Sequence, residues 1–159
     1  MSTLSDEFRR FEASPPPELF GDPIWRLPAY RIAEFLGEVV QRDIPILFRA
    51  GCSGFRVSQL ERAVDSISAN ISEGYSRYSG RERARFYEIA LGSAREARSW
   101  YRRAARFLPD EAALERALLL TRAVKILKVA IPQERSGSSE RRIRKAPNGK
   151  PAPASSPEQ

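Results

Sequence analysis

Apolar residues recur at the spacing of an α-helix along most of the middle of the chain. The clearest case lies at 60–71, where four aliphatic residues follow one another at steps of four, three and four and so share one helix face. Two long stretches without proline, 46–108 and 110–131, leave room for long helices, because proline breaks a helix interior. The pattern predicts four helices, at roughly 27–43, 56–75, 79–108 and 110–131.

Local signals mark the expected ends of these helices. The dipeptide Ile44-Pro45 is expected to end the first, because the residue before a proline avoids helical dihedral angles. Ser79 and Glu82 form a capping-box pattern at the start of the third, in which each side chain accepts a hydrogen bond from the other residue's backbone. Asp110 is a suitable N-cap for the fourth helix, which is expected to end near Ile131-Pro132.

The pattern predicts an all-α fold. No stretch of the sequence shows sustained period-two alternation of β-branched residues, so no sheet is expected. Four helices with short connections favour an antiparallel up-down-up-down four-helix bundle, which we place at 24–131. We interpret 1–23 as a flexible N-terminal segment. The segment 132–159 is rich in proline, serine and charge, and is interpreted as a disordered basic tail.

The predicted fourth helix is apolar over more than one face. Three residues outside its main seam, Leu118, Leu119 and Ile126, are also apolar. This predicts either a wide core face or a second contact between subunits of a homo-oligomer. The residues of the main seam are Leu114, Ala117, Leu120, Val124, Leu127 and Ile131.

Composition excludes several kinds of chemistry. The chain has no histidine, which excludes His-dependent catalytic triads and His metal sites. Its single cysteine, Cys52, excludes an internal disulfide framework and multi-Cys zinc sites, and permits a reducing, cytoplasmic location. The N-terminus lacks the apolar segment of a signal peptide, and no apolar run is long enough to span a membrane. We expect no cofactor, no metal, no small-molecule substrate and no enzymatic activity.

Charge gives the sharpest functional signal. The net charge is +7, and most of the 27 basic residues are arginines. On a helical wheel the third helix has an apolar side and, opposite it, seven arginines within an arc of about 140°. Like charges on one face repel one another unless an anion or a partner lies against them. We predict a face that binds the phosphates of RNA or DNA; the alternative is a solvated face with some arginines paired to glutamates. The arginines are Arg81, Arg85, Arg95, Arg98, Arg102, Arg103 and Arg106, with Arg95, Arg98, Arg102 and Arg106 as the main candidates.

A line of polar residues lies beside the apolar seam of the second helix. Ser66, Asn70, Glu73 and Arg77 follow one another at steps of four, three and four, provided that the helix continues to Arg77. Polar groups at the edge of a buried face must be hydrogen-bonded. We interpret this line as a device that sets helix register or caps a neighbouring turn, rather than as a ligand site.

Two motifs resemble a known family. The runs SISANISEG at 66–74 and ALGSARE at 90–96 occur in this order in the bacterial four helix bundle protein family. That family includes proteins encoded within intervening sequences of large-subunit ribosomal RNA genes, and is related to the accessory variability protein of diversity-generating retroelements. The resemblance implies an antiparallel bundle that forms ring-like homopentamers, a basic surface for nucleic acid, and no enzymatic activity. Ser68 departs from the proline that many members have there.

Two functions follow as hypotheses. The first is a non-enzymatic, homo-oligomeric bundle that binds nucleic acid through its arginine face, as an accessory to a retroelement or to ribosomal RNA. The second is a protein-interaction scaffold that docks a partner enzyme such as a reverse transcriptase, without direct contact to nucleic acid.

Overall fold

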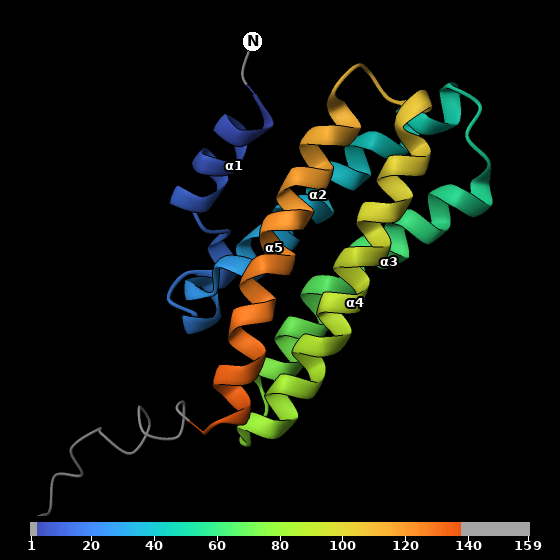
Figure 1. The fold of residues 1–159 in the computed structure, drawn as a ribbon. Coiled ribbons are helices and arrows are strands. Elements are labelled where there is room, and N and C mark those ends of the chain that lie inside the picture. The colour runs from blue at the N-terminus through green and yellow to red at the C-terminus, as the bar shows by residue number, and fades with distance from the viewer. Residues whose placement is uncertain (1–2, 138–159) are drawn as a thin grey trace, which may run out of the picture.

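Five α-helices make up most of the chain in the computed structural model, which describes residues 3–137. Three short 3-10 helices lie between them (Figure 1). The α-helices are α1 (Leu4–Ala13), α2 (Pro28–Arg49), α3 (Gly54–Tyr75), α4 (Gly80–Ala104) and α5 (Ala112–Arg135). The 3-10 helices are η1 (Pro17–Leu19), η2 (Pro23–Arg26) and η3 (Ala105–Phe107).

Helices α2 to α5 form a four-helix bundle. Each packs against the next, and α5 returns to pack against α2, so the core lies between all four. Short connections make consecutive helices antiparallel (Figure 1). Fully buried aliphatic residues fill the centre, among them Val39, Leu60, Ile67 and Leu120. The all-α bundle predicted from periodicity is confirmed. None of the helices within residues 3–137 is both long and apolar enough to cross a membrane.

Small residues let α4 approach its neighbours closely. Its buried side is rich in alanine, including Ala90, Ala94 and Ala97. A Cβ atom added to Gly80 would lie 2.2 Å from the Glu134 carbonyl oxygen of α5. Close contact between backbones therefore requires glycine at this position, where α4 begins.

Two predicted helix ends were wrong because buried contacts outweigh a local proline. Helix α2 continues through Pro45 to Arg49, since the next turn places Leu47 in the core with no exposed surface. Helix α5 likewise continues through Pro132 to Arg135. Its last turns are held to α4 by ion pairs, one of which joins Arg83 Nε to Glu134 Oε2 at 2.7 Å.

The predicted start of the third helix is confirmed, and the predicted start of the fourth is wrong. Ser79 is the N-cap of α4, and its hydroxyl accepts a hydrogen bond from the Glu82 amide at 3.1 Å, as half of the predicted capping box. Asp110 was predicted as the cap of α5, but this helix begins at Ala112 after Glu111, which has φ of 66°. The left-handed turn at Glu111 moves the helix start past Asp110.

The interpretation of 1–23 as a flexible segment is corrected by α1. Thr3 and Asp6 form a capping box at its start, and Leu4 and Phe8 are buried against the bundle. The Phe8 and Phe35 ring centroids lie 5.4 Å apart, so α1 extends the core onto α2. A helix of this length is marginal alone, and packing stabilises it. The proposed tail at 132–159 contributes its first four residues to α5, and 138–159 lie outside the described residues.

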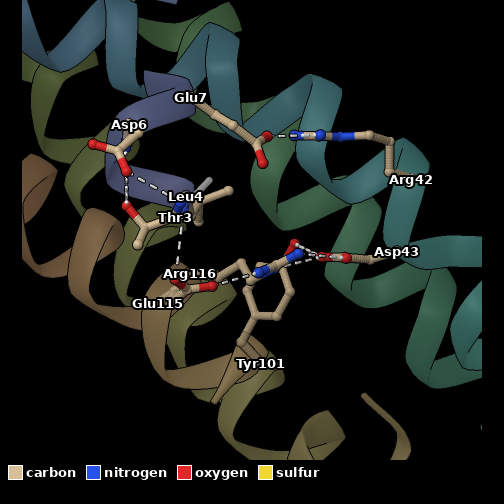
Figure 2. A network of polar contacts seen from close by, with 9 residues as sticks. All are labelled: Thr3, Leu4, Asp6, Glu7, Arg42, Asp43, Tyr101, Glu115 and Arg116. Carbon is tan, nitrogen blue, oxygen red and sulfur yellow. Dashed lines mark hydrogen bonds and ion pairs between the residues drawn. The ribbon is translucent and has the colours of Figure 1, made fainter. Parts of the chain in front are cut away.

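A buried polar cluster joins α2, α4 and α5 (Figure 2). Asp43 has no exposed surface; it accepts hydrogen bonds from the Tyr101 hydroxyl at 2.9 Å and from Arg116 at 3.0 and 3.1 Å. Arg116 also pairs with Glu115, which accepts the backbone N–H of Leu4 at 3.4 Å. Burial raises the pKa of Tyr101 well above its ordinary value, and the nearby Asp43 charge raises it further.

Tyrosine burial predicts weaker folding at alkaline pH. Burial, and next the Glu134 carboxylate, raises the pKa of Tyr87 to about 12 from 10.0. A raised pKa in the folded state contributes stability that is complete below pH 10 and is lost as pH rises toward 12. Between pH 9 and 11 the loss from Tyr87 is about 1.3 kcal/mol. We expect the free energy of unfolding of Tyr87→Phe to fall less than that of wild type between these pH values, by about this amount, as measured by urea denaturation. An equal fall in variant and wild type would contradict the prediction.

Candidate nucleic-acid interface

The predicted arginines extend along nearly the whole of α4 and into η3. Their positions follow from one continuous helix, in which residues four apart lie on the same side. Arg98 is half-buried, and the other six are exposed. They do not form one uniform site, because their neighbours differ along the helix.

Three of the arginines line a groove between α4 and α5, which we call the arginine groove. Its volume is about 570 Å³. Alanines on α5 leave this space open, since a larger side chain at Ala113 or Ala117 would fill it. The groove therefore has a cationic wall and an apolar floor. Its residues are Arg95, Arg98, Ser99 and Arg102 of α4, Ala105 of η3, and Ala113, Leu114 and Ala117 of α5.

The charges in the arginine groove are not neutralised by the bundle. Within residues 3–137, no carboxylate lies within 4.0 Å of the guanidinium nitrogens of Arg95, Arg98 or Arg102. Arg98 is held in place, because its Nη1 donates a hydrogen bond to Thr121 Oγ1 at 3.0 Å. Planar guanidinium groups that lack a carboxylate partner are suited to bidentate contacts with phosphate oxygens.

The remaining four predicted arginines lie elsewhere. The guanidinium of Arg103 lies over the Trp100 ring at 4.9 Å, and that of Arg106 over the Phe107 ring at 4.6 Å. Arg81 and Arg85 are exposed near the start of α4, ten or more residues before Arg95. At about 1.5 Å per residue this places them roughly 15–20 Å from the groove. The arginines predicted from the wheel thus fall into three groups: three in the groove, two over aromatic rings, and two near the start of α4.

The polar line of the second helix lies at the contact between α3 and α4. Ser66 Oγ and Ser93 Oγ are 2.9 Å apart, and Asn70 Nδ2 donates to the Ser66 carbonyl at 2.7 Å. Helix α3 ends at Tyr75, before Arg77, and Arg77 still forms an ion pair with Glu73. The Ser66–Ser93 bond joins the two helices, the Asn70 bond lies within α3, and the Glu73–Arg77 ion pair joins α3 to the turn that follows it. This arrangement fits a role in setting helix register.

Two buried charges were not identified from the sequence. Arg83 lies on α4 among the predicted arginines, yet only 7% of it is exposed; it donates to Glu134 and to the carbonyls of Arg77 and Tyr78. On the helical wheel Arg83 lies outside the arc of the seven predicted arginines, and this could have distinguished it from them. Asp43 follows Leu36, Val39 and Val40 at helical spacing on the buried side of α2, which also indicates burial.

Comparison with known protein families identifies a match. A family model described as 23S rRNA-intervening sequence protein matches residues 54–143. The match includes α3, α4 and α5, and with them the whole arginine groove. No curated protein matches the chain, and no solved structure does.

Proposed function

Because the chain belongs to the 23S rRNA-intervening sequence protein family, we propose that it is a non-enzymatic accessory protein that binds the phosphate backbone of RNA. The arginine groove is the binding site in this proposal. Arg95 and Arg102 contact phosphates from the exposed rim, and Arg98 contacts them from a position fixed by Thr121. Binding is driven by the release of counterions from the nucleic acid, so little sequence preference is expected.

One observation carries this proposal: three arginines without carboxylate partners line one groove. Elsewhere carboxylates of α1 neutralise cations of α2, as with Arg31 beside Glu12 and Arg42 beside Glu7. Unpaired like charges along one wall repel one another. An anion with several oxygens removes that repulsion, and the phosphates of RNA supply such groups at regular spacing.

A second candidate function rests on exposed leucines of α5. Leu114 is 58% exposed and Leu118 is 60% exposed, and the two lie one turn apart. An apolar pair of this kind favours contact with protein. In this alternative the chain is a scaffold that assembles with copies of itself, or docks a partner enzyme such as a reverse transcriptase, and its arginines face acidic protein surface.

The proposal is tested by reversing two charges of the groove. We expect Arg95→Glu with Arg102→Glu to lower affinity for a structured RNA about 100-fold at ~100 mM salt. Both side chains are exposed, so the fold is retained, whereas Arg98 is bonded to Thr121 and is left unchanged. The measurement is a binding titration across roughly 50 to 200 mM salt. The slope of log affinity against log salt concentration should be shallower for the variant, by the amount that about two phosphate contacts contribute.

The control is Arg26→Glu, which reverses one exposed arginine of η2 and so makes half of the charge change of the groove variant. It removes the same kind of charge far along the chain from the groove and should change affinity only slightly. Equal affinities for wild type and the doubly reversed variant, with both folded, would refute the groove as an RNA site. Retained capture of a protein partner by that variant would then favour the scaffold.

A further inference from the structure

Exposed aromatic rings gather at the end of the bundle where α2 joins α3. Phe55, at the start of α3, is 68% exposed, and Phe48, near the end of α2, is 52% exposed. The Phe55 ring meets the Trp100 ring of α4 edge to face, with centroids 6.3 Å apart and planes at 82°. We call Phe55 and Trp100 the aromatic patch. Phe48 and Phe55 are exposed while Trp100 is half-buried, and large apolar side chains exposed together mark contact sites more often than single ones do.

The aromatic patch is bordered by a cation, Arg103. The Arg103 guanidinium lies over the Trp100 ring at 4.9 Å, which is cation–π geometry. Trp100 Nε1 donates to Glu96 at 3.3 Å, a bond that orients the indole. The patch therefore lies beside a planar cation, and Trp100 and Arg103 come from consecutive turns of α4.

The patch and the arginine groove lie on two sides of the same end of α4. Arg102 lines the groove and the next residue, Arg103, covers Trp100. An α-helix with side chains is about 10–12 Å across. An extended nucleic-acid strand laid over the last turns of α4 can therefore contact arginines with its phosphates and reach the rings with its bases.

We propose that the aromatic patch stacks unpaired bases, so that this protein binds single-stranded RNA in preference to duplex. This inference rests on the proposed function, because the arginine groove supplies the backbone contact. Every base has a π face that stacks on phenylalanine, tryptophan or a guanidinium plane, whatever its identity. A duplex keeps its bases stacked inside and offers only phosphates. The Arg103 guanidinium above the Trp100 ring adds a second planar group on which a base can stack.

The test is Phe55→Ala, with Phe20→Ala as the matched control. Phe20 is 83% exposed and lies after η1, so both variants remove an exposed ring. We expect Phe55→Ala to lower affinity for a single-stranded RNA roughly 5- to 150-fold, the effect of losing one stacked base. Its affinity for a duplex of the same length should change less than about twofold, and Phe20→Ala should change neither.

A fluorescence measurement reports on Trp100 directly. The chain has 2 tryptophans, so Trp25→Phe leaves Trp100 as the only one. We expect a single-stranded oligonucleotide to quench this fluorescence by stacking, and an abasic oligonucleotide of the same length to leave it nearly unchanged. Quenching by both would mean that phosphate binding, rather than base stacking, changes the indole environment, and would overturn the inference.

Failure of the inference is distinguishable from failure of the proposed function. If Phe55→Ala leaves single-strand affinity unchanged while Arg95→Glu with Arg102→Glu still lowers it, stacking is wrong and the groove remains. If Phe55→Ala alters the subunit count but not single-strand affinity, the patch is a contact between copies of the chain, and stacking is wrong. If wild type binds neither single strands nor duplex at low salt, both proposals are wrong.

Discussion

Replacing Asp43 by alanine is expected to lower the free energy of unfolding by about 3–5 kcal/mol. Asp43 has no exposed surface and accepts three hydrogen bonds, from Tyr101 and Arg116 (Figure 2). Its removal leaves the Arg116 guanidinium, whose side chain is 14% exposed, without its main counter-charge. A buried charge without a partner costs far more than the ion pair contributes. Urea denaturation followed by circular dichroism measures the change.

Two further variants separate the buried charge from the loss of a carboxylate in general. Asp65→Ala removes an exposed carboxylate of α3 and should change stability by less than about 0.5 kcal/mol. Asp43→Leu combined with Tyr101→Phe and Arg116→Met replaces the whole cluster by apolar groups and should recover most of the loss. If Asp43→Ala were as mild as Asp65→Ala, the cluster would not be buried in solution.

Phe8→Ala is expected to lower the free energy of unfolding by about 3–5 kcal/mol. Phe8 is 2% exposed and packs on Phe35, and the Arg122 guanidinium lies over its ring at 5.4 Å. It is the largest buried side chain of α1 and, with Leu4 and Phe11, holds this helix on α2 and α5. The measurement is again urea denaturation, with limited proteolysis to detect cleavage within 4–13.

Phe20→Ala is the control for this prediction, since Phe20 lies nearby in the sequence but is exposed. It should change stability by less than about 0.5 kcal/mol. Equal and small effects of the two substitutions would mean that α1 does not remain docked in solution, and the interpretation of 1–23 as flexible would then be correct.

The helices of the bundle could be predicted from the sequence, but several of their ends could not. Periodic apolar residues indicate α3 and α4, because a helix that buries one face has its apolar residues three or four positions apart. Pro45 misled the prediction for α2, because the cost of one lost hydrogen bond is local while the burial of Leu47 depends on the other helices. Helix α1 was missed for a related reason, since a helix of ten residues is stabilised mainly by what it packs against.

The candidate site was predicted only in part. The wheel placed seven arginines on one face of α4, and all seven lie on that helix or on η3. Which of them share a groove depends on α5, whose Ala113 and Ala117 leave space beside Arg95, Arg98 and Arg102. The partner that buries Arg83 is Glu134, 51 residues away in the chain. No spacing within α4 contains this information.

The sequence by itself determined the all-α architecture, the order of the bundle helices and the concentration of arginine on α4. Each of these is a local property, because side-chain spacing along one helix decides which residues share a face. Only the tertiary structure decided which charges are paired, which are free, and that Phe55 meets Trp100. These depend on how closely and at what rotation helices pack, which is decided by all the side chains of the core together.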